Sequence, residues 1–130
     1  MRVVQVDRRG GPEVLNVTER EAPRPGPGQV VVDVAAAGVN YMDIYQRQGI
    51  GGYRPDLPFV PGAEGAGTVA AVGEGVTHLA LGDPVAWAGL GSGYAEQVVL
   101  PAKRLVPVPP GISLPIGPSR RSARTFSVRA

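Results

Sequence analysis

The sequence of 130 residues contains no cysteine and only one histidine, His78. Without cysteine the chain can form neither a disulfide nor a thiolate zinc site, and a single imidazole leaves too few nitrogen ligands for zinc. We therefore expect the protein to bind no metal.

The sequence also lacks a long apolar run. No stretch approaches the roughly 18 consecutive apolar residues of a membrane span. Met1 is followed directly by Arg2 rather than by the hydrophobic core of a signal peptide. These absences predict a cytoplasmic protein that makes no contact with a membrane.

The excess of basic residues is confined to one end of the chain. The formal net charge is +2, yet all eleven acidic residues lie at or before Glu96, and four arginines lie beyond residue 119. Without residues 115–130 the charge balance is slightly negative. A nearly neutral domain with only 5% aromatic residues has neither the basic face nor the stacking residues that nucleic-acid binding requires. We expect no nucleic-acid partner.

Glycine (19 residues) and proline (14 residues) are abundant, and they fall between apolar runs instead of forming low-complexity tracts. This pattern is typical of a turn-rich β fold, and the length suits one domain. We predict a mainly β fold, a partly closed β barrel with one or two short helices and a core that ends near Leu114. The predicted strands cover residues 2–6, 15–21, 29–37, 68–72, 84–88, 94–100 and 104–106.

Residues 40–48 form the one convincing helix. Asn40 can cap its start, Asp43 lies in the first turn near the positive end of the helix dipole, and Gly49 can adopt the left-handed conformation that ends it. A loop broken by glycine and proline follows over residues 49–61. Such a loop often carries function when a rigid scaffold holds it.

Residues 65–70, with the sequence GAGTVA, formally match a dinucleotide-binding fingerprint. That fingerprint must follow a buried strand and open a helix. Here Pro58 and Pro61 interrupt the preceding segment, and β-branched residues alternate after it. We predict that the glycines allow a tight strand entry and close backbone packing instead.

Six motifs occur in one order along the chain. Together they resemble the quinone oxidoreductase, or zeta-crystallin-like, branch of the zinc-free medium-chain dehydrogenase/reductase superfamily, over residues 2–114. The motifs are GGPEVL (10–15), GVNYMDIYQRQG (38–49), PGAEGAG (61–67), GDPV (82–85), GYAE (93–96) and VPPG (108–111).

The resemblance implies a GroES-like catalytic domain that packs against a Rossmann domain, with NADPH and a quinone or related enone meeting in the cleft between them. Most contacts to the cofactor would lie on the Rossmann domain, for which this chain has no sequence. Zinc-dependent relatives carry cysteine at the position of Asn40 and histidine at the position of Ala63, so the resemblance also implies no zinc. The parent enzyme is expected to be a homodimer.

The same resemblance implies three catalytic residues, Asn40, Tyr45 and Tyr53. Amide and phenol groups can orient a quinone and donate hydrogen bonds as negative charge develops on it. Asn40 and Tyr45 are also expected to contact NADPH. Each residue has a structural alternative: Asn40 as a plain helix cap, Tyr45 as a core aromatic, and Tyr53 as a loop residue packed on the barrel.

Four further polar or aromatic residues are assigned structural roles. Asp43 is expected to be a hydrogen-bonding group at the helix end, Glu64 a buried structural carboxylate, His78 a surface residue and Trp87 a core or edge residue.

Beyond Leu114 the resemblance stops. Family members continue into an acidic, alanine-rich helix, whereas this chain continues with arginine, serine and proline to Ala130. The change of composition and the excess of arginine over lysine suggest out-of-frame translation of a GC-rich gene. We expect residues 115–130 to be a disordered or non-native tail and the chain alone to be inactive. The alternative is a stand-alone GroES-like binding module without catalysis.

Overall fold

The computed structural model describes residues 1–112 and 114, so the predicted tail over residues 115–130 lies outside the described residues. Within them the fold is mainly β with one α-helix, as the sequence predicts. No helix among these residues is long and apolar enough to cross a membrane. The elements are β1 (Arg2–Val6), β2 (Leu15–Glu19), β3 (Gln29–Ala37), α1 (Tyr41–Gln48), β4 (Glu64–Val72), β5 (Pro84–Ala88), β6 (Gln97–Pro101) and β7 (Val106–Pro107), with 3₁₀ turns at Pro12–Val14 and Ala102–Arg104.

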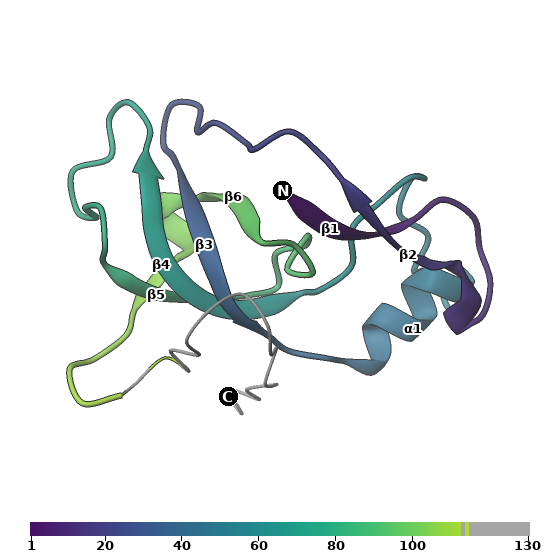
Figure 1. Cartoon of the computed structure of the whole chain (residues 1–130). Coiled ribbons are helices and arrows are strands. Elements are labelled where there is room, and N and C mark those ends of the chain that lie inside the picture. Colours follow the sequence, from purple (N-terminus) through teal and green to yellow (C-terminus); the bar gives the residue numbers. More distant parts are fainter. Residues whose placement is uncertain (113, 115–130) are drawn as a thin grey trace.

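The strands form two antiparallel sheets that do not close on each other (Figure 1). The larger sheet has the order β6-β3-β4-β5-β7, and the smaller one pairs β1 with β2 from Arg2↔Glu19 to Val6↔Leu15. Because every strand pair in the described part of the chain is antiparallel, this part contains no parallel βαβ unit of the kind that binds dinucleotides.

Strand β3 lies between β6 and β4 and supplies much of the core. Its residues Val30, Val31 and Val32 are at most 2% exposed, so consecutive side chains are buried on both faces of the sheet. This explains the nearly continuous apolar run that predicted the strand. The main core cluster consists of Val30, Val32, Val69, Leu79, Val85, Trp87, Val98, Leu100, Ala102 and Leu105.

Strand β4 begins at Glu64, four residues before its predicted start at residue 68, so this part of the prediction is wrong. Gly65 and Gly67 lie inside the strand, where they pair with β3 on one side and β5 on the other. A Cβ at Gly65 would lie 2.6 Å from a ring carbon of Trp87, and one at Gly67 would overlap the Asp33 carbonyl oxygen. The glycines therefore serve close packing, and the rejection of a dinucleotide fingerprint is confirmed.

The strand predicted over residues 94–100 begins at Gln97, three residues later than predicted, because its first residues form hydrogen bonds with other segments. The Tyr94 N–H donates to the Pro61 carbonyl, and the Glu96 N–H donates to the Arg2 carbonyl, so neither amide joins the larger sheet. The strand predicted over residues 104–106 is replaced by the second 3₁₀ turn and the short β7, because the Leu105 N–H bonds back to Ala102.

We expect Gly67→Ala to lower the free energy of unfolding by about 3 kcal/mol, near the upper end for overpacking, because backbone atoms obstruct the new methyl group. The Val32 Cγ1 atom would also lie 2.8 Å from it. Urea unfolding followed by Trp87 fluorescence measures the loss. Gly91→Ala is the matched control, since no atom lies within 4 Å of its added Cβ, and it should change stability by under about 0.5 kcal/mol. Equal effects of the two substitutions would contradict the packing role.

Candidate functional site

Helix α1 buries charged residues and exposes aromatic ones. Asp43 and Arg47, one turn apart, are only 6% and 7% exposed, whereas Tyr41 and Tyr45 are 76% and 39% exposed. A surface helix usually has the opposite arrangement, with its apolar stripe facing the core. The buried charges must therefore find partners inside the domain, and the tyrosines face outward.

Asp43 joins three segments at the start of α1. Its Oδ2 atom accepts hydrogen bonds from the Asn40 N–H (2.8 Å) and the Tyr94 hydroxyl (2.9 Å), while Oδ1 accepts one from the Gly62 N–H (3.2 Å). Burial, together with the hydrogen bond to Asp43 and the charge of its carboxylate, raises the pKa of Tyr94 well above its ordinary value. The prediction that Asp43 bonds at the helix end is confirmed.

The other end of α1 is fixed through Arg47. Its Nη1 atom donates to the Gly10 carbonyl (2.9 Å), and the Gly10 N–H donates back to the Arg47 carbonyl (3.1 Å). Gly49 ends the helix in the left-handed conformation, with φ of 70°, and its N–H bonds to the Tyr45 carbonyl. The helix is thus anchored at both ends by residues distant in sequence.

The three predicted site residues lie on or beside α1. Asn40 is half-buried at the N-cap position with an extended backbone, and Tyr45 lies about 7–8 Å further along the helix axis. The rings of Tyr45 and Tyr53 face each other with centroids 5.8 Å apart and a tilt of 35°. At 39% and 42% exposure, neither tyrosine is a core residue.

Exposed apolar residues are concentrated in the segment of the chain that carries this pair. Of the eleven large hydrophobic residues that are exposed in the described chain, six lie between residues 39 and 57. Such a concentration marks a surface that binds a ligand or another protein segment. We call it the α1 apolar surface: Val39, Tyr41, Tyr45, Ile50, Tyr53 and Leu57.

Glu64 lies close to this region from strand β4. It is half-buried, less than the sequence predicts, and its carboxylate lies where a Cβ of Gly38 would be. Gly38 is buried two residues before Asn40, and a larger residue there would force the Glu64 side chain to move. The side chain of Glu64 thus packs against the strand end that leads into α1.

Asn40 and the buried Ala63 occupy the two positions at which the resemblance implies zinc ligands in zinc-dependent relatives. Among residues 1–112 and 114, no three histidine, aspartate or glutamate side chains cluster in a way that could hold a metal ion. We predict that the purified, untagged protein contains no stoichiometric zinc, because an amide and a methyl group do not replace a thiolate and an imidazole. Elemental analysis measures this, and one tightly bound zinc per chain would contradict it.

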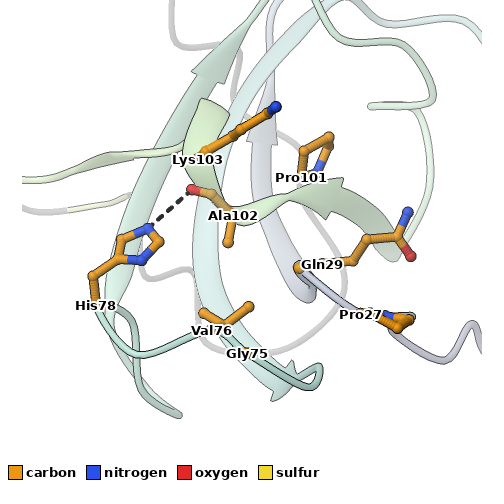
Figure 2. Close-up of a pocket in the computed structure, with 9 residues that line it drawn as sticks. Pro27, Gln29, Gly75, Val76, His78, Pro101, Ala102 and Lys103 are labelled. Carbon is orange, nitrogen blue, oxygen red and sulfur yellow. Dashed lines mark hydrogen bonds between the residues drawn. The ribbon is translucent and has the colours of Figure 1, made fainter.

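An open pocket lies elsewhere, at the opposite end of β3. It has a volume of about 500 Å³, and Figure 2 shows His78 directed from one side of it toward the Ala102 carbonyl oxygen, with Nε2 at 3.3 Å. His78 is exposed and its ring has this backbone partner, in agreement with the predicted surface role. Strand β3 begins beside this pocket at Gln29 and ends near α1. The pocket and the start of α1 are therefore separated by the length of β3, about 27 Å for an extended strand. The other lining residues are Pro27, Gly28, Gly75, Val76, Pro101 and Lys103.

Residues 26–110 match the model of the alcohol dehydrogenase GroES-like domain. The chain belongs to this family. Similar proteins include a quinone oxidoreductase of Pseudomonas aeruginosa, 44% identical over 84% of this chain and 34% of the relative. A synaptic vesicle membrane protein VAT-1 homolog of Rattus norvegicus is 41% identical over 77% of this chain and 25% of the relative.

Among solved structures, the Escherichia coli quinone oxidoreductase in complex with NADPH matches the GroES-like domain with a TM-score of 0.83 and 34% identity. The match covers 88% of this chain and 35% of that one. The chain thus spans about a third or less of the length of these relatives. The predicted resemblance to quinone oxidoreductases of the medium-chain dehydrogenase/reductase superfamily is confirmed.

Sequence reasoning missed two contributors to the α1 region. Tyr94 lies 51 residues from Asp43, and nothing in its motif GYAE indicates that its hydroxyl reaches the helix. Arg9 bonds to the last turn of α1 from 37 residues away in the sequence, and no sequence pattern assigned it a role. No local sequence signal indicates either contact, because each joins residues that are far apart in the chain.

Proposed function

We propose that the GroES-like domain forms the substrate side of an NADPH-dependent oxidoreductase that transfers a hydride to a quinone or a related enone. The observation that carries the proposal is the exposed Tyr45–Tyr53 ring pair on the α1 apolar surface, on the helix that Asn40 begins as its N-cap residue. Similarity to quinone oxidoreductases that include an NADPH complex supports it.

The three side chains suit a flat, conjugated carbonyl compound. Two aromatic rings at this separation offer a face and an edge against which a quinone ring can pack. The Asn40 amide and the tyrosine hydroxyls are neutral donors for the oxygen on which negative charge develops. When bound, NADPH supplies the hydride. Because a quinone spreads the resulting charge over its ring and second oxygen, such donors suffice without a metal ion.

The described residues do not fit the pyrophosphate of NADPH. Dinucleotide-binding folds place that group at a free helix N-terminus, but the N-terminus of α1 already receives the buried carboxylate of Asp43. The GAG sequence of the formal dinucleotide fingerprint lies inside β4. Asn40 and Tyr45 therefore remain as contacts for the nicotinamide end only, and the rest of the cofactor must be held by protein outside this chain.

The α1 apolar surface is proposed to face that missing part. Large hydrophobic side chains exposed in this concentration are costly for an isolated domain and favour a covered surface in the complete enzyme. The relatives are long enough to provide the cover, since this chain spans about a third of the quinone oxidoreductases. We also propose that the complete enzyme is a cytoplasmic homodimer that binds no zinc.

NADPH fluorescence titration tests whether tight binding of the cofactor requires protein outside this chain. The chain alone should not bind NADPH tightly. A chimera that adds the portion of the Pseudomonas aeruginosa quinone oxidoreductase not covered by this chain should bind it. Tight binding by the chain alone would contradict the proposal and favour a stand-alone binding module.

A further inference from the structure

Arg9 connects the two segments that carry the tyrosine pair. Its Nη1 atom donates a hydrogen bond to the carbonyl of Gln46 in the last turn of α1 (2.8 Å), and its Nη2 atom donates one to the carbonyl of Pro55 in the following loop. The guanidinium carbon also lies 5.9 Å from the centroid of the Phe59 ring. One side chain therefore spans helix, loop and the start of the next segment.

The loop that carries Tyr53 has few other attachments. At its start, the Ile50 N–H bonds to the Tyr45 carbonyl and the Tyr53 N–H to the Ile50 carbonyl, and at its end Phe59 pairs with Val6. Between these points, the bond from Arg9 to Pro55 is the one hydrogen bond that ties residues 54–58 to another segment within the described chain. The position of the loop over α1 therefore depends on this arginine.

The charge and shape of Arg9 suit this place. A cation is stabilised at a helix C-terminus by the partial negative charge of the last carbonyls. A guanidinium presents several N–H groups in a fixed plane, so it can bond two carbonyls on separate segments at once, whereas an ammonium is a single point of charge. The side chain also runs close over Gly49, whose added Cβ would lie 3.1 Å from Arg9 Cδ.

We propose that Arg9 is a positioning residue that sets the spacing of Tyr45 and Tyr53 by holding the loop over residues 50–58 against the end of α1. Its effect on catalysis rests on the function proposed above, whereas its effect on the tyrosine pair does not. Arg8 provides a matched control, because it is the adjacent arginine, is exposed, and makes no hydrogen bond or ion pair in the described chain.

The test on the chain itself uses nuclear Overhauser contacts between the ring protons of Tyr45 and Tyr53. We expect these contacts to be lost in Arg9→Ala and weakened in Arg9→Lys, which keeps the charge but lacks the fixed planar donors of the guanidinium. They should be unchanged in Arg8→Ala. Arg9→Lys keeps the test decisive if Arg9→Ala does not fold. Ring contacts of wild-type intensity in Arg9→Lys and in any folded Arg9→Ala would overturn the proposal.

A second arm uses the chimera described above. Arg9→Lys should raise the KM for quinone about two- to tenfold, equivalent to losing one aromatic contact, with a smaller change in kcat. A merely structural role would lower the folded fraction, and hence the apparent kcat, without raising KM. An unchanged KM would overturn the catalytic consequence of the proposal. If the chimera shows no turnover at all, the proposed function fails, while the ring contacts still decide the role of Arg9.

Discussion

Asp43→Ala is expected to lower the free energy of unfolding by about 3–5 kcal/mol. The substitution leaves three donors without their acceptor: the N–H groups of Asn40 and Gly62 and the hydroxyl of Tyr94. A buried donor that loses its partner costs about 1–3 kcal/mol. The methyl group of alanine cannot accept a hydrogen bond, so it does not compensate the three donors. For a domain whose total stability is about 5–15 kcal/mol, the loss is large. Urea unfolding measures it.

Two variants show whether the loss arises from this network. Asp33→Ala is the matched control, because Asp33 is exposed and accepts one side-chain hydrogen bond, from Gln97, so its replacement should cost under about 1 kcal/mol. Tyr94→Phe removes one of the three donors and should make the Asp43→Ala change less costly in the double variant. Additive effects of the two substitutions would contradict the coupling described for Asp43.

In the chimera, Asn40→Ala and Tyr53→Phe are each expected to lower kcat by up to about a hundredfold, which corresponds to roughly 3 kcal/mol of transition-state stabilisation. In the proposed function, each substitution removes a donor whose hydrogen bond strengthens as negative charge develops on the substrate. The affinity for NADPH should change much less, since in the proposed enzyme most contacts to the cofactor lie outside this domain. Quinone-dependent oxidation of NADPH under saturating conditions measures kcat.

Asn16→Ala serves as the control for this pair, because Asn16 is an exposed residue of β2 whose amide bonds to the neighbouring Val14 carbonyl. Its kcat should match that of the unmodified chimera. If Asn40→Ala and Tyr53→Phe also match it, the two residues do not act in catalysis, although the family assignment would stand.

Local signals in the sequence were sufficient for several elements. The bounds of α1 follow from Asn40 at its start and Gly49 at its end, and those of β3 follow from its apolar run. In both cases the determining interactions lie within a few residues of the element. The mainly β class followed from the same kind of information, since turns and short apolar runs alternate along the whole chain.

Features that depend on distant segments could not be predicted in this way. Strand β4 begins in a glycine-rich stretch because Trp87 and the backbone of β3 occupy the space beside Gly65 and Gly67. The outward direction of Tyr45 results from the inward bonds of Asp43 and Arg47, whose partners lie elsewhere in the chain. Only the folded arrangement reveals which face of α1 is buried.

We propose that this domain supplies the substrate side of a hydride-transfer site and depends on a nucleotide-binding part that the described residues do not form. The most direct test compares quinone-dependent oxidation of NADPH, followed at 340 nm, by the 130-residue chain and by the chimera at equal concentration. We expect no turnover above background from the chain and sustained turnover from the chimera. Sustained turnover by the chain alone, or none by a folded chimera that binds NADPH, would contradict the proposal.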